Sequence, residues 1–157
     1  MAIKTNAMRI LESNGIAYEE YSLDIKEALD GVNCANMLGV PLDRTFKTLV
    51  TQGKSGNYYV FVVPVAAKLD LKKAANSVGE KNVEMLPMKN LLPITGYVHG
   101  GCSPIGMKKV FTTVIDETAI LFDKIYLSGG KRGCQLYIDP QVLADFIDAE
   151  FADLTKE

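Results

Sequence analysis

The sequence contains few of the side chains that build metal centres and disulfide frameworks. Its 157 residues include one histidine, His99, and three cysteines, Cys34, Cys102 and Cys134, which are far apart and form no CxxC pair. A structural zinc site needs a full set of Cys and His ligands, so the ligand count argues against a metal. An odd number of scattered cysteines argues against disulfides and indicates a reducing compartment. We therefore expect no metal and no other cofactor.

The sequence also lacks a long apolar run. The longest such runs, for example residues 58–65, are far too short to cross a bilayer. The first residues, MAIKTNAMRI, lack the continuous apolar stretch of a secretory signal. We therefore expect a cytoplasmic protein that has no membrane partner.

The length and composition predict one globular domain. A chain of 157 residues that is 48% hydrophobic can bury a core, and it fits a single domain over residues 1–157. The net charge of −2 argues against nucleic acid as a partner, and we expect no DNA binding. However, acidic residues gather near both ends and lysines in the middle, which is consistent with a locally basic face. Scattered surface lysines are the simpler alternative.

Hydrophobic periodicity, caps and turn residues predict a mixture of helices and strands. Helices are expected after the N-cap Thr5, near residues 32–38, from the N-cap Asp70 to Gly79, between Pro87 and Pro93, and from Pro140 onward. Strands are expected over residues 17–23, 45–52, 58–65, 83–86, 110–115, 124–128 and 133–138, with a further short strand within 96–106. The short turns between strands indicate an α+β fold with a mixed, mostly antiparallel sheet or a barrel-like core surrounded by helices.

Lys47, in the segment FKTLV, is the first residue with a candidate chemical role. Alternation along a strand places Phe46, Thr48 and Val50 on one face, which Phe46 and Val50 mark as the core face. Lys47 then lies on the opposite, semi-polar face, which is either open to solvent or the floor of a cleft. An ordinary exposed lysine is the more common case for this residue type.

Two glycine-rich segments are candidate ligand-binding loops. The first, residues 96–106, contains the pair Gly100 and Gly101, whose backbone amides can approach a carbonyl oxygen or a phosphate. The second, residues 127–135, places Lys131 and Arg132 at the tip of a hairpin, which suits a phosphate contact. Both also have a purely structural explanation, as a tight connection and as an ordinary polar hairpin. Neither has the spacing of a dinucleotide fingerprint or a P-loop.

A conventional protein nucleophile is hard to assemble from this sequence. A Ser-His-Asp or Cys-His arrangement would have to use His99, and Cys102 need not face that histidine in an extended loop. Cys34 falls within a helical pattern and is expected as a small core residue. A hydrolase with this sequence would depend on substrate positioning, backbone donors and one charged side chain.

Five segments occur in the order typical of the YbaK/EbsC family, which the chain resembles over almost its whole length. They are FKTLV at 46–50, LDLKKAA at 69–75, VEML at 83–86, TGYVHGGCSPIGMKK at 95–109 and SGGKRG at 128–133. The FKTLV and GMKK segments resemble the branch of Cys-tRNA(Pro)/Cys-tRNA(Cys) deacylases. The family is similar to the editing domain of bacterial prolyl-tRNA synthetases, so the resemblance implies that fold.

The resemblance also implies roles for individual residues. The family's essential lysine corresponds to Lys47 and its glycine pair to Gly100 and Gly101, which would form the catalytic site. Substrate binding is implied for Tyr21, Thr48, Ser103, Ser128, Gly129 and Gln135, and phosphate contacts for Lys131 and Arg132. Two positions depart from the family pattern: several relatives have aspartate where Gln135 stands, and Leu23 competes with Tyr21 for the family's tyrosine.

The activity implied by the resemblance is hydrolysis of the ester that joins cysteine to the terminal ribose of proline tRNA. Prolyl-tRNA synthetase attaches cysteine by mistake, because small pockets discriminate poorly between side chains of similar size. In the family mechanism the substrate's own thiol attacks its ester carbonyl, which gives a cyclic thiolactone and free tRNA without a protein nucleophile. The implied partners are aminoacyl-tRNA and prolyl-tRNA synthetase. Two alternatives stay open: a deacylase for another small ester such as Ala-tRNA(Pro), and an EbsC-type regulator that binds RNA or a partner without turnover.

Overall fold

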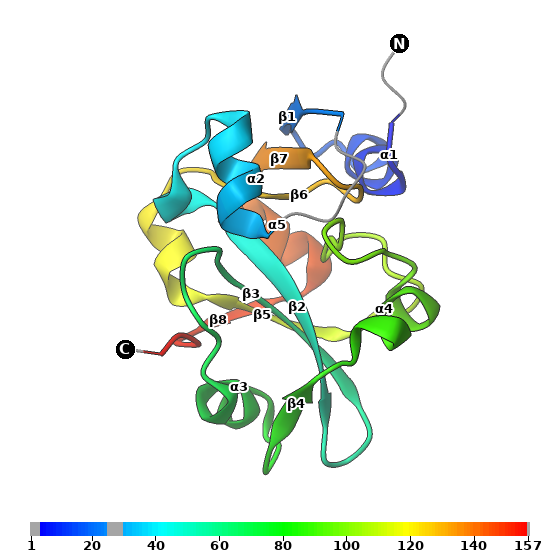
Figure 1. Cartoon of the computed structure of the whole chain (residues 1–157), viewed down its shortest axis with the longest axis vertical. Coiled ribbons are helices and arrows are strands. Elements are labelled where there is room, and N and C mark those ends of the chain that lie inside the picture. Colours follow the sequence, from blue (N-terminus) through cyan, green and yellow to red (C-terminus); the bar gives the residue numbers. More distant parts are fainter. Residues whose placement is uncertain (1–3, 25–29, 157) are drawn as a thin grey trace.

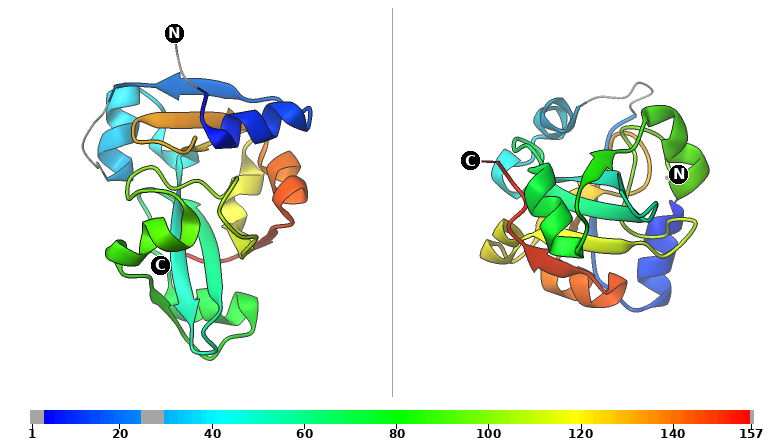
Figure 2. Two further views of the ribbon diagram at one scale, coloured as in Figure 1. Left: turned by 90° about the vertical axis from the view of Figure 1, so that its right-hand side faces the viewer. Right: turned by 90° about the horizontal axis from the view of Figure 1, so that it is seen from below.

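The computed structural model describes residues 4–24 and 30–156, which form two β-sheets with helices packed around them (Figure 1). A three-stranded sheet lies at the top of that view, and a five-stranded sheet extends to the opposite end of the molecule. Figure 2 shows the long hairpin of the larger sheet running away from the smaller one. No helix among the described residues is long and apolar enough to span a bilayer.

The smaller sheet has an apolar face and a polar face. Its strands, in the antiparallel order β1-β7-β6, are β1 (Glu19–Ser22), β6 (Ile125–Ser128) and β7 (Cys134–Ile138). Because side chains alternate along a strand, Leu127 and Leu136 point to one face. They are buried in one cluster with Met8 of helix α1 (Asn6–Ser13). The opposite face carries polar side chains, including Gln135.

The larger sheet has the strand order β4-β2-β3-β5-β8. Its strands are β2 (Phe46–Gly53), β3 (Tyr58–Pro64), β4 (Val83–Met85), β5 (Thr112–Asp116) and β8 (Glu150–Ala152). β2 pairs antiparallel with β3 and β4, whereas β5 runs parallel to β3 and β8 runs parallel to β5. The predicted α+β class with a mixed, mostly antiparallel sheet is confirmed.

Four of the α-helices described here begin at a residue whose side chain caps the first turn. Besides α1 the helices are α2 (Gly31–Leu38), α3 (Leu71–Val78), α4 (Met88–Thr95) and α5 (Pro140–Ile147), with the short 3-10 helices η1 (Leu42–Arg44) and η2 (Glu117–Leu121). The side chains of Thr5, Asp30, Asp70 and Asp139 accept backbone N–H hydrogen bonds in the first turns of α1, α2, α3 and α5. The predicted caps Thr5 and Asp70 are confirmed.

Some sequence predictions are wrong in detail. Helix α4 does not stop before Pro93 but continues to Thr95, whose Oγ1 donates a hydrogen bond to the Leu91 carbonyl. Residues 96–106 contain no strand, since the chain there makes irregular turns with a positive φ at Gly100. The strand expected over 110–115 begins only at residue 112. Strand β8 was not predicted, because it is defined by its pairing with β5, which is distant along the chain.

The two sheets meet at the start of β2. Thr45, immediately before β2, makes an isolated bridge with Tyr126 of β6. Phe46 is buried in the same core cluster as Leu127 of the smaller sheet and Ile115 of the larger one. This junction places the first residues of β2 beside β6.

Candidate active site

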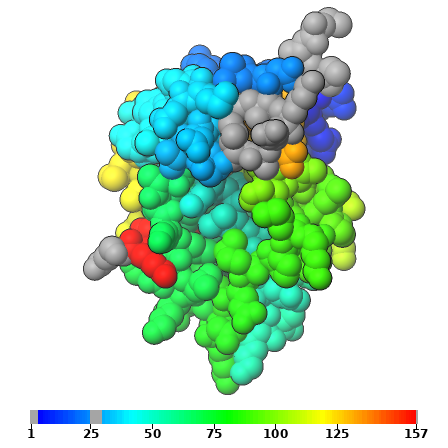
Figure 3. Space-filling view, in the orientation of Figure 1, coloured from blue at the N-terminus to red at the C-terminus, as the bar shows by residue number. Residues whose placement is uncertain are grey.

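A cavity of about 570 Å³ opens at the junction of the two sheets. Its walls come from the start of β2, the first turn of α2, the loop 96–106 and the polar face of the smaller sheet. In Figure 3, α2 and the loop stand forward on either side of β2, which lies deeper. The predicted site residues that line this cavity are Lys47, Thr48, Gly100, Ser128 and Gln135.

Lys47 borders this cavity and is half-buried, so the structure decides for a cleft over open solvent. Burial lowers the pKa of its ammonium group, and the negative charge of Asp30 opposes that shift.

The two faces of β2 do not divide into a core face and a polar face, as the alternation predicted. Thr48, assigned to the core face, lines the cavity beside Lys47, and Leu49 on the predicted polar face packs against the core cluster of α3. Both faces of the strand are covered because other elements pack on each side.

The two glycines of the pair have different structural roles. Gly100 lines the cavity with a φ of 88°, a conformation that glycine adopts without strain. Gly101 does not line it, and its N–H already donates to the Val98 carbonyl at 3.0 Å. A Cβ at Gly101 would lie 3.0 Å from the backbone of Lys131 and Arg132. The Gly101 amide is therefore already paired in this structure, and the absence of a side chain there allows the two loops to pack closely.

Three predicted residues lie in one row across the smaller sheet. Tyr21 of β1 and Ser128 of β6 are both directly opposite Gln135 of β7, and opposite residues of antiparallel strands share a face. Gln135 and Ser128 line the cavity. Tyr21 does not, because its ring packs edge-on against Tyr126, with ring centroids 5.3 Å apart. The row brings Tyr21 beside the site without exposing its ring to the cavity.

Among the residues that the structure describes, two buried polar atoms of cavity-lining side chains have no hydrogen-bond partner. They are Thr48 Oγ1 and Gln135 Oε1, and Gln135 as a whole is 9% exposed. Leaving a buried acceptor unpaired costs about 1–3 kcal/mol. Such atoms are uncommon in folded proteins and call for a partner. A ligand with hydrogen-bond donors would supply one.

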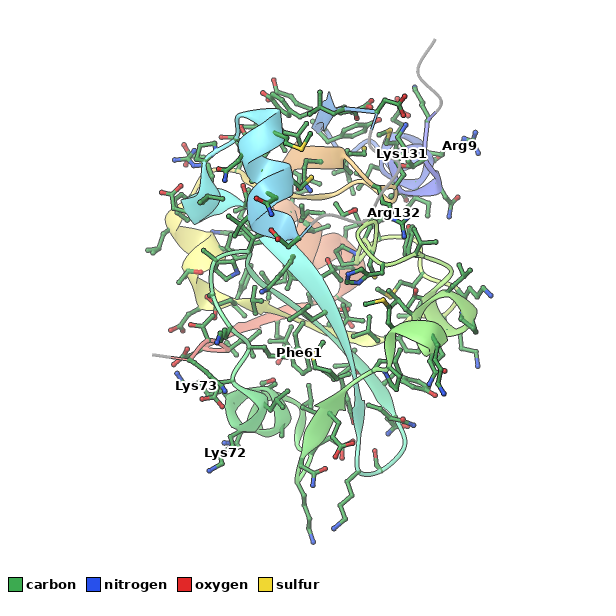
Figure 4. All side chains as sticks on the ribbon, viewed as in Figure 1. Arg9, Phe61, Lys72, Lys73, Lys131 and Arg132 are labelled. Carbon is green, nitrogen blue, oxygen red and sulfur yellow. The ribbon has the colours of Figure 1, made fainter. Side chains whose placement is uncertain are left out.

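The remaining predicted residues lie outside the cavity wall. Ser103 is fully buried, and its Oγ accepts a hydrogen bond from the Ile105 N–H. Gly129 is buried, and a Cβ there would lie 2.5 Å from Cys134 Sγ. Lys131 and Arg132 occupy the turn between β6 and β7, far from the lysines of α3 (Figure 4). Arg132 Nε donates to the carbonyl of His99 at 2.9 Å, which joins this turn to the cavity wall.

Comparison with known sequences assigns this chain to a family. The family model described as an aminoacyl-tRNA editing domain matches residues 26–146. The chain belongs to this family. Editing is the removal of an amino acid from tRNA, so the predicted enzyme class, an aminoacyl-tRNA deacylase, is confirmed, and aminoacyl-tRNA is its substrate class.

Similar proteins agree with this assignment. Over 155 residues the editing domain is 44% identical to an Enterococcus faecalis protein named as a candidate Cys-tRNA(Pro)/Cys-tRNA(Cys) deacylase, EbsC, covering 98% of this chain and 94% of that protein. It is 29% identical over 120 residues to a proline–tRNA ligase of Thermosipho melanesiensis, covering 76% of this chain and 21% of the ligase. The solved structure of a candidate trans-editing enzyme for prolyl-tRNA synthetase has a TM-score of 0.81 and 24% identity, covering 99% of this chain and 100% of that one. The resemblance to the YbaK/EbsC family and the fold that it implies are confirmed.

The thiols that line the cavity of this editing domain are not reactive thiolates. Burial raises the pKa of the Cys34 thiol, and it raises the pKa of Cys102 to about 12. Both groups therefore stay protonated near neutral pH, and the thiolate is the nucleophilic form. Cys34 is buried as predicted, but it also faces the cavity. Within residues 4–24 and 30–156, no group of three or more His, Cys, Asp or Glu side chains is placed to hold a metal ion.

The first turn of α2 is the part of the editing site that sequence patterns missed. Asp30 lines the cavity and caps the helix, with Oδ1 accepting from the Asn33 N–H at 2.8 Å. A Cβ at Gly31 would lie 2.5 Å from Val65 Cγ1, so the absence of a side chain lets α2 approach the end of β3. A capping signal locates the start of a helix, but it does not reveal what that end packs against.

Proposed function

We propose that this editing domain removes cysteine from Cys-tRNA(Pro), with the thiol of the substrate as the nucleophile. The composition of the cavity carries the proposal. In the part of the chain that the structure describes, a half-buried lysine, a glycine amide and two unpaired polar atoms surround the cavity, while its cysteine thiols are protonated. Such a site can orient a substrate and stabilise charge, but its thiols are not activated for attack. A cysteinyl ester brings its own nucleophile.

The proposed reaction is an intramolecular substitution. The substrate Sγ attacks its own ester carbonyl carbon, the new S–C bond closes a thiolactone, and the bond from that carbon to the ribose oxygen breaks. The thiol proton ends on the ribose oxygen, which releases free tRNA. Because the thiol is already held near the carbonyl at high effective concentration, the enzyme mainly has to orient it.

In this proposal each residue of the cavity acts on one part of the substrate. Protonated Lys47 contacts the terminal ribose or phosphate and stabilises the negative charge that develops, and the Gly100 N–H supplies a second donor. Thr48 and Ser128 hold the ribose hydroxyls. Lys131 and Arg132, in the turn between β6 and β7, contact phosphates of the tRNA.

The proposed partner is prolyl-tRNA synthetase, in the cytoplasm. The net charge of −2 favours weak, salt-dependent binding of free tRNA, because phosphate contacts dominate such affinity. Delivery of the mischarged tRNA by the synthetase would compensate for that weak binding.

A deacylation panel tests the proposed function. It compares cysteinyl, alanyl and prolyl esters on proline and cysteine tRNAs, with and without the synthetase. We expect Cys-tRNA(Pro) to be cleared fastest and to release a product with the mass of cysteine minus water. Equal clearance of Ala-tRNA(Pro) would favour the water-dependent deacylase, and tight binding without turnover would favour the regulator.

The pH dependence of deacylation should report the protonation of Lys47. Its pKa is lowered from the usual lysine value of 10.5, so the active ammonium form is lost at a lower pH than in an exposed lysine. We therefore expect the rate, corrected for spontaneous ester hydrolysis, to fall as the pH rises through this lowered pKa. Lys47→Arg should move the fall to higher pH, because arginine keeps its proton. An identical alkaline limb in Lys47→Arg would contradict a charged Lys47.

A further inference from the structure

The charged side chains that border the cavity have opposite signs. Among its described lining residues, Lys47 carries the one ammonium group and Asp30 the one carboxylate. An aminoacyl ester also has two electrostatic ends. Its α-ammonium group is positive, whereas its carbonyl oxygen becomes negative during deacylation. A site with one charge of each sign can therefore orient the ester.

Asp30 has capacity for a further hydrogen bond. Its Oδ1 accepts from the Asn33 N–H, and its Oδ2 accepts from Asn33 Nδ2, both at 2.8 Å. An ionised carboxylate has about four acceptor positions, so both oxygens can accept again. Capping alone does not require a cavity, because Asp70 caps α3 in the same way and does not line this cavity.

Gln135 presents a second acceptor to the same cavity. The residue is 9% exposed and lines the cavity, and its Oε1 has no hydrogen-bond partner within residues 4–24 and 30–156. Its side chain also interacts with the thiol of Cys34, which lies in the first turn of α2. Asp30, Cys34 and Gln135 all line the cavity, so Cys34 lies between the two acceptors along one wall. An unpaired buried acceptor is costly unless a bound group donates to it.

We propose that Asp30 and Gln135 together form the subsite that recognises the α-ammonium group of the aminoacyl ester. This inference rests on the proposed function and assigns the amino-group subsite of the same cavity. An α-ammonium group has several N–H donors, enough for both acceptors at once. Lys47 repels that group and attracts the developing oxyanion, so the two ends of the substrate are held in one orientation. Asp30 thereby becomes a specificity residue, distinct from its capping role.

The test compares two thiol esters of tRNA(Pro) that differ only in the α-amino group. Cysteinyl-tRNA(Pro) has it, and 3-mercaptopropionyl-tRNA(Pro) lacks it but keeps the thiol needed for ring closure. The measured quantity is kcat/KM for cysteinyl-tRNA(Pro) divided by kcat/KM for 3-mercaptopropionyl-tRNA(Pro). Differences in intrinsic ester reactivity cancel when the ratio of a variant is compared with that of the wild type.

Asp30→Asn is the decisive variant, because asparagine still caps a helix but carries no charge. We expect it to lower the ratio about tenfold or more, and Gln135→Leu to do the same. The matched control is Asp70→Asn, which removes the same charge from the cap of α3 and should leave the ratio unchanged. A wild-type ratio in folded Asp30→Asn and Gln135→Leu would overturn the α-ammonium subsite. Absence of turnover on both esters by the wild type would instead refute the proposed function.

Discussion

We expect Lys47→Ala to lower kcat/KM for deacylation of Cys-tRNA(Pro) by about a hundredfold or more. The side chain borders a cavity in which it is half-buried, so its charge is less screened than on an open surface. Among the described residues of the cavity wall, no other lysine or arginine can replace it. Single-turnover release of labelled cysteine under limiting substrate measures the loss.

The controls separate the loss of charge from a loss of folding. Lys47→Met keeps most of the side-chain volume and removes a half-buried charge, so its urea midpoint should be no lower than that of the wild type. Lys72→Ala removes an exposed lysine on α3, at the far end of the molecule, and should be neutral (Figure 4). Full activity of Lys47→Ala or Lys47→Met would remove the lysine from the mechanism.

Gly31→Ala should be the second most damaging change, although it adds a single methyl group. The new Cβ would lie 2.5 Å from Val65 Cγ1 and 2.8 Å from Val65 Cβ, too close for α2 to keep its place. We expect a loss of about 1–3 kcal/mol in the free energy of unfolding, as for overpacked cores. Because the same turn carries Asp30, kcat/KM should fall about tenfold or more. Urea unfolding and the deacylation assay measure the two effects.

A second substitution tests whether that steric overlap is the cause. Val65→Ala removes Cγ1, the nearer of the two atoms that the new methyl group would meet, but keeps Cβ, so Gly31→Ala/Val65→Ala should recover part of the activity lost in Gly31→Ala. The two changes should be strongly non-additive, as expected for residues in contact. Additive losses would mean that Gly31 acts through something other than its contact with Val65.

Local signals in the sequence were sufficient for most secondary structure. Thr5 and Asp70 are recognisable N-caps, and α3 ends at Gly79 in a left-handed conformation that favours glycine. These features depend on residues that are close along the chain, so they can be recognised in the sequence before the fold is known. β8 and the continuation of α4 through Pro93 could not be read in this way, because strand pairing and packing decide them.

Motif resemblance predicted a set of site residues, but it did not predict how each residue of a motif packs. Lys47, Gly100 and Ser128 line one cavity although they come from three distant segments. Gly101, by contrast, is adjacent to Gly100 in sequence but packs against the turn that contains Lys131. Neighbours in a loop can point to different surroundings, and only the packing of the two loops separates their roles.

The sequence alone therefore determined the α+β class and the family, and it predicted a lysine with two glycine-rich loops as the chemical site. The tertiary structure decided that Lys47 is half-buried, that Thr48 and Gln135 each have an atom unpaired among the described residues, and that Asp30 belongs to the same cavity. The physical reason is that caps, turns and motifs involve residues close along the chain. Burial and electrostatic environment arise instead from contacts between α2, β2 and the smaller sheet, which meet only in the folded protein.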